Sequence, residues 1–428
     1  MKVLHITAGA GNMYCGSCLR DNNLAMALRA AGHDVILLPV YTPTHTDETN
    51  GSSTKVFFGG IGVYLQQNIP LFRKLPRFLD KLWDSSFALK QASKSTLPVD
   101  PKFLGEMTLS MLRGEGGALR REFDKLTEWL EHEPPPDIVN ITNSLLIGMA
   151  EPIRRTLKRP VCCTLQGEDL FLEGLEERYR SQALDLIRKA VQHVDLFIAV
   201  SEYCGELMRE YLRIPDSKQR VVPIGINAGR YSNQRQRDDS FRIGYFARVC
   251  PEKGLHNLCD AFALLRREHP ETKMTLEAAG YLAPEHEGYL SKLKDVEYKG
   301  SLEWDDKVKF LGSLDAFSVP ADYVETKGIS VLEAMASGVP VVQPRHGAYI
   351  EMIEHTGGGI LVEPKNPRAL ADALWSVWAD PAMAARLGEQ GGAGVRERHT
   401  AERMARETAA AMESVTQART GQLFKGVS

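Results

Sequence analysis

Short apolar segments alternate along most of the chain with longer segments of helical spacing. In the first half, the strand-like segments are "VLHIT", "DVILLPV", "DIVNIT", "VCCTL" and "DLFIAVS". Between them lie stretches such as residues 17–31 and 145–157, whose apolar residues recur at intervals near 3.6. Because repeated β–α units build a parallel sheet with helices on both faces, this pattern predicts a doubly wound α/β domain.

A second series of the same kind begins at residue 241, after a polar segment. Its strand-like segments are "RIGYFA", "KMTLEAAG", "LDAFSVP", "VPVVQP" and "GGILVE". Ligands of open α/β sheets bind beyond the carboxyl ends of the strands, so two such domains facing each other would enclose a cleft. We expect four parts: an N-terminal Rossmann-like domain, a linker, a C-terminal Rossmann-like domain, and a helical tail that packs on the N-terminal domain. They cover residues 1–226, 227–240, 241–400 and 401–428.

The alternation breaks between residues 51 and 136, where we predict a helical insertion in the first domain. Within it, residues 71–83 place five apolar side chains near one helical face and basic side chains on the other positions. A basic amphipathic helix is typical of a membrane surface, but Pro76 interrupts a long continuous helix here. We therefore favour packing on the first domain over peripheral membrane contact.

Composition limits the classes of partner. A net charge of −3 on 428 residues gives no general attraction to nucleic acid or to anionic lipid, so a polyanion must be met by a local basic cluster. The N-terminal segment lacks the apolar core of a secretory signal, and no run of eighteen apolar residues occurs, which predicts a cytoplasmic protein. Seven cysteines, an odd count in a long chain, do not indicate a disulfide scaffold.

The stretch "YVETKGISVLEAMASGVPVVQPRHG" carries two glutamates among small and apolar residues. The pattern places Glu325 in a loop at the carboxyl end of a strand and Glu333 about one turn into the following helix. The amides of about residues 327–330 are then unpaired donors at a helix N-terminus, which suit a phosphate. We interpret Glu333 as an acceptor for a ribose diol and Glu325 as an acceptor for sugar hydroxyls, although a pair of solvated surface glutamates has the same spacing.

Two cations follow another strand of the second domain, at its carboxyl end. Arg248 and Lys253, in "IGYFARVCPEKGL", follow its first strand and precede its first helix. Hydrogen bonds from charged donors to phosphate are about twice as strong as neutral ones, and a departing diphosphate needs such stabilisation. Together with the glutamate-containing loop, the two cations define a candidate diphosphate site.

These segments resemble the C-terminal domain of the family 4 retaining glycosyltransferases of the GT-B fold. The similarity is specific over roughly residues 241–379 and looser in the first domain, through "AMALRAAGHDVILL", "DLFIAVSEYCGELM" and "RVVPIGIN". It implies transfer of a glycosyl unit, in particular a hexosyl unit, from a nucleoside diphosphate sugar with retention at the anomeric carbon. The family's Glu-x7-Glu motif matches Glu325 and Glu333, and its phosphate-binding basic pair matches Arg248 and Lys253. The resemblance thus marks Arg248, Lys253 and Glu325 as catalytic.

The sequence departs from the family pattern at the donor sugar. "CTLQGED" has Gln166 where members commonly carry a histidine, and Gln can hydrogen-bond a hydroxyl without carrying charge. Lys327 replaces a usual aromatic residue. The expected donor-binding residues are Glu333, Lys327, Gly328, Ile329, Ser330 and Gln166. In the first loop, "TAGAGNMYCGSC", the residues expected on the acceptor side or in the glycine loop are Gly9, Gly11, Cys15, Gly16 and Cys18.

No Asp-x-Asp motif is present that would hold a divalent metal on a diphosphate. The basic pair and the helix amides replace it, so we expect a metal-independent enzyme without a cofactor. The acceptor, whether a sugar, a lipid-linked compound or a small molecule, is left open, as are the base and the sugar of the donor.

Three other functions fit parts of the sequence. A nicotinamide enzyme is disfavoured because Gly9, Gly11 and Gly16 give G-x-G-x4-G, and the second strand ends without a ribose-binding acid. Cys15 and Cys18 form a C-x-x-C at the predicted start of a helix, which lowers a thiol pKa and suggests a thiol-regulated variant; a zinc site would need two further ligands. A catalytically silent sugar-nucleotide-binding protein is the third alternative.

Overall fold

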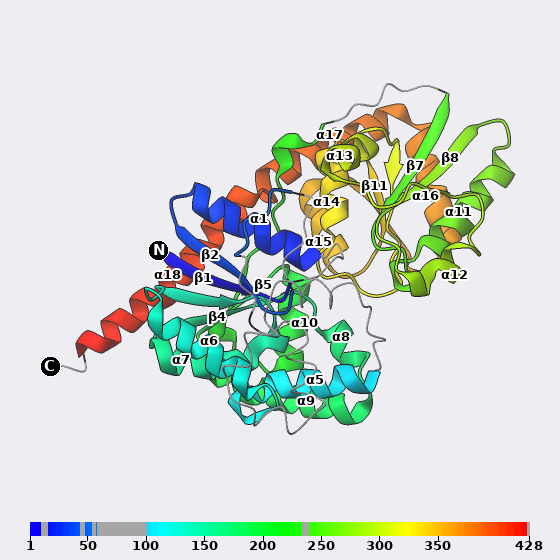
Figure 1. Cartoon of the computed structure of the whole chain (residues 1–428). Helices are drawn as coiled ribbons and strands as arrows, with labels where there is room; N and C mark the ends of the chain where they lie inside the picture. Colours follow the sequence, from blue (N-terminus) through cyan, green and yellow to red (C-terminus); the bar gives the residue numbers. More distant parts are fainter. Residues whose placement is uncertain (10–15, 43–47, 54–56, 58–100, 233–238, 426–428) are drawn as a thin grey trace. The chain divides into compact units, whose positions relative to one another are not determined.

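The computed structural model of the chain describes residues 1–9, 16–42, 48–53, 57, 101–232 and 239–425 (Figure 1). Much of the insertion expected over residues 51–136, including the amphipathic segment at 71–83, lies outside the described residues. The chain divides into two units. Unit 1 comprises Met1–Val200, Cys204–Val222 and Met404–Ser428, and unit 2 comprises Ser201–Tyr203 and Pro223–Arg403.

Unit 1 contains a six-stranded parallel sheet in the order β2-β1-β3-β4-β5-β6. Every residue of β3, β4 and β5 is buried, as expected for strands covered on both faces. The strands are β1 (Lys2–Thr7), β2 (Asp34–Pro39), β3 (Ile138–Ile141), β4 (Val161–Leu165), β5 (Leu196–Ala199) and β6 (Gln219–Val221). The helices are α1 (Gly16–Ala30), α5 (Pro101–Leu112), α6 (Arg120–His132), α7 (Ala150–Leu157), α8 (Asp169–Glu173), α9 (Glu177–Ala190) and α10 (Glu202–Leu212), whose first two residues group with unit 2.

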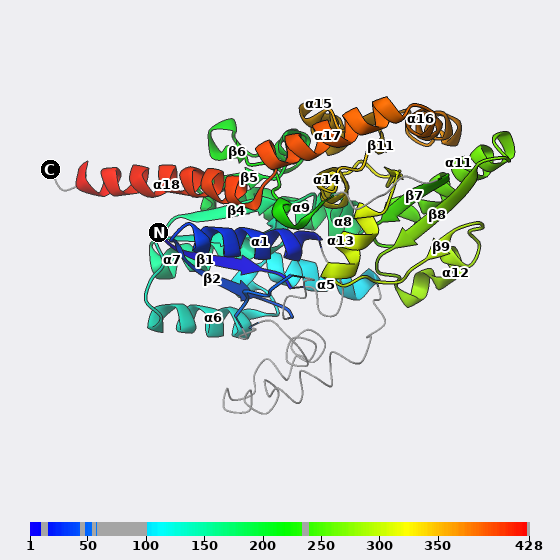
Figure 2. The same ribbon diagram turned by 90° about the horizontal axis from the view of Figure 1, so that it is seen from above.

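The last helix, α18 (Ala401–Lys425), completes the core of unit 1. Met404 and Met412 of this helix are buried against Leu24 of α1 and Val3 of β1 in one hydrophobic cluster. Figure 2 shows α18 running alongside these elements. The chain therefore returns to its first unit after the second one is complete.

Unit 2 contains a second six-stranded parallel sheet, in the order β12-β11-β10-β7-β8-β9. Its strands are β7 (Ser240–Phe246), β8 (Lys273–Ala279), β9 (Glu297–Tyr298), β10 (Ala316–Phe317), β11 (Val341–Pro344) and β12 (Gly359–Val362). Its helices are α11 (Leu255–Glu268), α12 (Glu287–Leu290), α13 (Trp304–Gly312), α14 (Ile329–Ala336), α15 (Ala348–Thr356), α16 (Pro367–Ala379) and α17 (Pro381–Arg398). Helix α11 packs on α16, and α14 and α15 pack on α17 (Figure 1). The prediction of two doubly wound α/β sheets is confirmed.

One glycine brings two functional loops of unit 2 together. Strands β7 and β10 are neighbours, so the loops that follow them start at the same edge of the sheet. Gly254, just before α11, has φ +73°, and a Cβ there would lie 1.9 Å from the carbonyl oxygen of Pro320 in the loop after β10. Only glycine combines this backbone conformation with so close an approach.

We predict that Gly254→Ala destabilises the protein more than Gly300→Ala does. Gly300 has a similar φ of +79°, but a Cβ at that position would meet no other atom within 4 Å, so its substitution should cost only the left-handed backbone strain of about 1–2 kcal/mol. Gly254→Ala adds a backbone clash. Urea unfolding of both variants measures the difference, and equal midpoints would show that the contact with Pro320 carries no weight.

Candidate functional site

The loops that follow β7 and β10 are tied to each other by backbone and side-chain hydrogen bonds. The amide of Asp322 donates to the carbonyl of Glu252 at 2.9 Å. Asn257 donates its side-chain amide to the carboxylate of Asp322 at 2.8 Å and to the carbonyl of Pro320 at 3.3 Å. These bonds fix Lys253, the last residue of the short helix η8 (Pro251–Lys253), against the loop that carries Glu325.

Lys253, Tyr323 and Glu325 form a compact charged cluster. The Nζ of Lys253 donates to Oε2 of Glu325 at 2.6 Å and to the hydroxyl of Tyr323 at 2.5 Å. The Tyr323 hydroxyl donates to the same carboxylate oxygen at 2.6 Å. Oε1 of Glu325 accepts the amides of Thr326 and Lys327, both at 3.2 Å. All four acceptor positions of the carboxylate are thus occupied.

The surroundings of Glu325 keep it ionised. Burial raises the pKa of this carboxyl, but the charge and hydrogen bond of Lys253 and the hydrogen bond of Tyr323 outweigh that effect and lower the pKa to about 2. Burial and the charge of Glu325 raise the pKa of Tyr323 far above its ordinary value, so its hydroxyl stays protonated and donates. The cluster is therefore a stable ion pair with one neutral donor at neutral pH.

Arg248 lies near this cluster with an exposed side chain. Its positive charge opposes the rise in the pKa of Tyr323. Among the residues that the structure describes, its guanidinium has no hydrogen-bond or ion-pair partner. Its charge also contributes to the lowered pKa of Glu252, but no carboxylate of the described residues lies within ion-pair distance. Since Lys253 is already paired with a carboxylate, Arg248 is the cation of the two that is left to meet an anion.

The N-terminus of α14 opens beside Glu325. Gly328 caps the helix with φ +62° and makes no side-chain capping bond. Within the described part of the chain, the amides of Gly328, Ile329 and Ser330 have no acceptor, as is usual for the first turn of a helix. Our expectation that the amide of Lys327 belongs to the same set is wrong, because Glu325 accepts it. Three amides remain to bind an anion.

Glu333 sits farther along α14 in a second, separate ion pair. Its Oε1 accepts Nζ of Lys307, on α13, at 2.8 Å and the hydroxyl of Tyr231 at 2.8 Å. Glu333 is 2% exposed and Glu325 is 4% exposed. The alternative of two solvated surface glutamates is therefore wrong.

Sequence reasoning missed Lys307, Tyr231 and Tyr323. A signal existed for Lys307, because it lies three residues after Trp304 and four before Leu311, on the face of α13 that the helical period predicts to be buried. A lysine on a buried face needs a partner, and Glu333 provides it.

In unit 1, Gln166 follows β4 and is buried. Its Nε2 donates to the carbonyl of Thr142 at 2.8 Å and to Oδ1 of Asp21 at 3.3 Å. The carboxylate of Asp21 also accepts hydrogen bonds from the hydroxyl of Thr7 at 2.8 Å and from the guanidinium of Arg20 at 3.2 Å. Gln166 stands where the family commonly has a histidine, and its side-chain amide nitrogen thus donates to groups of the protein.

Asp21 and Arg20 form a fully buried charged pair that the sequence reasoning did not single out. Burial raises the pKa of Asp21, but the hydrogen bond and charge of His5 and the charge of Arg20 outweigh it, so the pKa is lowered. Burial lowers the pKa of Arg20. Their adjacency in "CLRDNN", at the start of a helix, is the available signal.

The first loop is described only in part. Gly9 has φ +79°, and a Cβ there would lie 1.8 Å from the carbonyl oxygen of Thr42, so this position requires glycine. Gly16 begins α1, while Gly11 and Cys15 lie outside the described residues. Cys18 is 2% exposed, which corrects the expectation of a partly reactive thiol at that residue.

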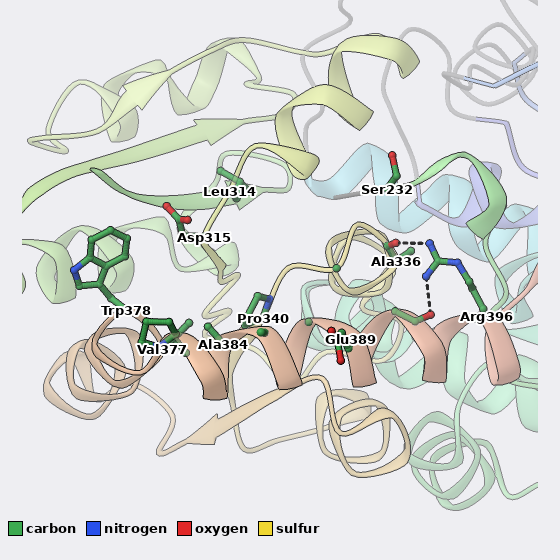
Figure 3. A pocket seen from close by; sticks show the side chains of 15 residues that line it. Ser232, Leu314, Asp315, Ala336, Pro340, Val377, Trp378, Ala384, Glu389 and Arg396 are labelled. Carbon is green, nitrogen blue, oxygen red and sulfur yellow. Dashed lines mark hydrogen bonds between the residues drawn. The ribbon is translucent and has the colours of Figure 1, made fainter. Parts of the chain in front are cut away.

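A cavity of about 710 Å³ lies elsewhere in unit 2 (Figure 3). Leu314 and Asp315 precede β10, and Gly338 and Pro340 precede β11, so the cavity opens at the amino ends of the strands. Arg396 borders it with its guanidinium bonded to the carbonyls of Gly392 and Ala336, both at 2.9 Å. Ligands of open α/β sheets bind at the other edge, and none of the predicted site residues lines this cavity.

The described part of the chain holds no group of three His, Cys, Asp or Glu side chains arranged to bind a metal ion. Likewise, none of the helices in that part is long and apolar enough to cross a bilayer.

The family models identify the chain as a glycosyltransferase. Residues 230–393 match the family model of glycosyl transferases group 1, and residues 107–230 match that of glycosyltransferase family 4. The chain belongs to the family 4 type of glycosyltransferases with the GT-B fold, which confirms the predicted family, fold class and enzyme class.

Relatives of known activity agree with this class. A glycogen synthase of Mycobacterium tuberculosis is 26% identical over 377 residues, which cover 85% of this chain and 83% of the relative. The lipopolysaccharide core biosynthesis mannosyltransferase LpcC of Rhizobium leguminosarum is 28% identical over 264 residues, 58% of this chain and 71% of the relative.

Solved structures share the fold over nearly the whole chain. Anabaena Alr3699/HepE, in complex with UDP and glucose, superposes with a TM-score of 0.67 at 18% identity and covers 97% of this chain and 100% of its own. The sucrose-phosphate synthase of Thermosynechococcus elongatus gives a TM-score of 0.68 at 18% identity, with 100% and 99% coverage.

We predict that Glu325→Gln destabilises the protein at pH 7 and that the deficit shrinks as the pH falls. The lowered pKa means that the carboxylate stabilises the fold above about pH 4.5 and that this contribution is lost as the pH falls toward about 2. Between pH 7 and pH 4 the difference from the wild type should decrease by about 1 kcal/mol.

Urea unfolding at the two pH values measures this difference. Glu354→Gln serves as the control, because Glu354 is 59% exposed and its pairing with Arg345 at 3.7 Å is solvated. A deficit for Glu325→Gln that does not change with pH would contradict the ion pair.

Proposed function

We propose that this glycosyltransferase moves a sugar from a nucleoside diphosphate sugar to an acceptor, with retention at the anomeric carbon and without a metal ion. The observation that carries the proposal is the exposed Arg248, which forms no ion pair with any described residue, beside the Lys253–Glu325 pair and the open N-terminus of α14. The complex of Alr3699/HepE with UDP and glucose supports a nucleotide-sugar donor.

The diphosphate would bind to three kinds of donor. Arg248 offers a planar fork of N–H groups. Lys253 uses two of its three ammonium hydrogens on Glu325 and Tyr323, which leaves one for a phosphate oxygen. The amides of Gly328, Ile329 and Ser330 complete the seat. These groups take the role of a metal ion, since they stabilise negative charge that grows on the diphosphate as the bond to the sugar breaks.

Glu325 is assigned to the sugar. Because its four acceptor positions are filled, a sugar hydroxyl bonds to it only by displacing one donor. The two amide contacts, at 3.2 Å, are the longest of the four and are the ones we expect to yield. Glu333 is assigned to the ribose through Oε2, which accepts no hydrogen bond within the described structure.

Retention needs no protein nucleophile in this scheme. The bond from the anomeric carbon to the phosphate oxygen breaks, and its electron pair stays on the diphosphate. The acceptor hydroxyl attacks on the same face, and its proton passes to the departing phosphate oxygen. The protein contributes position and charge stabilisation, so Arg248 and Lys253 act on the leaving group directly.

We predict that Arg248→Ala lowers turnover about 100-fold or more and weakens binding of the donor much less, because the diphosphate gains charge in the transition state. Arg266→Ala is the control, since Arg266 is an exposed arginine of α11 that pairs with Asp295. The assay follows nucleoside diphosphate release from UDP-, GDP- and ADP-sugars, with and without EDTA. Normal turnover of Arg248→Ala, or loss of activity in EDTA, would contradict the proposal.

Substitution of the two glutamates should change different kinetic constants. Glu333→Gln should raise the KM for the donor by about 10-fold or more, because a hydrogen bond to a charged group is worth about 1.5–3 kcal/mol, with less change in turnover. Glu325→Gln should mainly lower turnover and weaken discrimination between donors that are epimeric at the contacted hydroxyl. Steady-state kinetics with both donors tests this, and identical losses in the two variants would refute separate roles.

A further inference from the structure

Each carboxylate of the Glu-x7-Glu stretch is paired with a lysine from a different element. Lys253 pairs with Glu325, and Lys307 of α13 pairs with Glu333. We infer that Lys307 is a positioning residue for donor binding, which fixes Glu333 so that its Oε2 is presented to the ribose of the nucleotide. This inference rests on the proposed function, in which Glu333 binds the ribose.

The hydrogen bonds of Glu333 are distributed unequally. Lys307 and Tyr231 both donate to Oε1 at 2.8 Å, and one oxygen has two acceptor positions. Oε2 accepts no hydrogen bond from any residue that the structure describes. The carboxylate is therefore held by one oxygen, and the other is left with its acceptor positions open for two vicinal hydroxyls.

Aromatic rings from three elements hold Lys307 in place. Its Nζ lies 4.3 Å from the ring centroid of Trp304, 5.9 Å from that of Phe246 and 6.0 Å from that of Tyr231. Tyr231 and Trp304 also contact each other edge to face, at 5.4 Å. At 1% side-chain exposure, the ammonium cannot turn to water, and the rings and Glu333 fix its position.

Lys307 also reduces the repulsion between the carboxylate of Glu333 and the diphosphate in the proposed site. Glu333 lies only three to five residues from the α14 amides assigned to the diphosphate. An uncompensated carboxylate one turn away would repel that group, and burial would strengthen the repulsion. Pairing with a buried lysine cancels the charge while leaving one oxygen able to accept hydrogen bonds. The ion pair therefore has a use beyond stability, for which buried pairs are weak evidence.

The decisive measurement compares a ribonucleotide with its analogue that lacks both ribose hydroxyls. The dissociation constants of UDP, GDP and ADP, and of the 2′,3′-dideoxy form of the tightest binder, are measured by calorimetry. The wild type should prefer the ribonucleotide by about 10-fold or more. In Lys307→Met, this preference should fall to about 3-fold or less. Both nucleotides should also bind more weakly than to the wild type, because Glu333 without its cation repels their diphosphates. Lys309→Met, at an exposed lysine of the same helix, should bind both as the wild type does.

A second comparison guards against misfolding of Lys307→Met, in which Glu333 is left buried without its cation. The double variant Lys307→Met/Glu333→Gln carries neither charge. If Lys307 acts through Glu333, the double variant should bind the ribonucleotide within about 2-fold of Glu333→Gln alone.

The outcomes distinguish a failure of the proposed ribose site from a failure of the inference about Lys307. If the wild type binds both nucleotides equally, Glu333 does not bind the ribose, and the proposed site fails together with the inference. If the wild type discriminates but Lys307→Met keeps that discrimination, or weakens both nucleotides equally, the inference about Lys307 alone is wrong. Additive losses in the double variant would also overturn it.

Discussion

Two ion pairs, each with a buried carboxylate, organise the site of unit 2, and the arrangement depends on their being separate. The Lys253–Glu325 pair, at 2.6 Å, joins the loop after β7 to the loop after β10. The Lys307–Glu333 pair, at 2.8 Å, joins α13 to α14. A buried carboxylate without a cation is costly, so each pair requires its loop or helix to take one position. Arg248 remains exposed and forms no ion pair with any described residue, so we expect it to meet an anion at this edge of the sheet.

Two glycines shape the backbone at the same edge of the sheet. Gly254 allows the Lys253 loop to approach Pro320 closely, and Gly328 begins α14 in a left-handed conformation without a capping side chain. The amide donors of α14 are therefore left for a ligand. In the function that we propose, the cations and these amides together stabilise the departing diphosphate without a metal ion.

Much of the fold could be predicted from the sequence because the central strands β3, β4 and β5 are buried on both faces and read as mostly apolar segments. Strands β6 and β9, of three and two residues, are too short to show a period, and β9 was not predicted. Arg248, Lys253, Glu325 and Glu333 could be found from motif spacing. Their partners were missed for different reasons. Tyr231 is 102 residues from Glu333, and no local pattern links the two. Tyr323 lies two residues from Glu325, but spacing alone does not show that its hydroxyl donates to that carboxylate. For Lys307, burial could be predicted from the helical period, but its partner could not. No sequence pattern indicated that all acceptor positions of Glu325 are occupied, because the two donors to Oε1 are backbone amides, which every residue except proline has.

The central claim is that the diphosphate of the donor binds at the N-terminus of α14. Amide hydrogen exchange over residues 327–331, with and without a bound nucleoside diphosphate, tests it most directly. The amides of Gly328, Ile329 and Ser330 lack an acceptor in the described structure, so the account predicts that exchange there slows when UDP, GDP or ADP binds. A nucleoside diphosphate that binds tightly and leaves exchange in this segment unchanged would contradict the account.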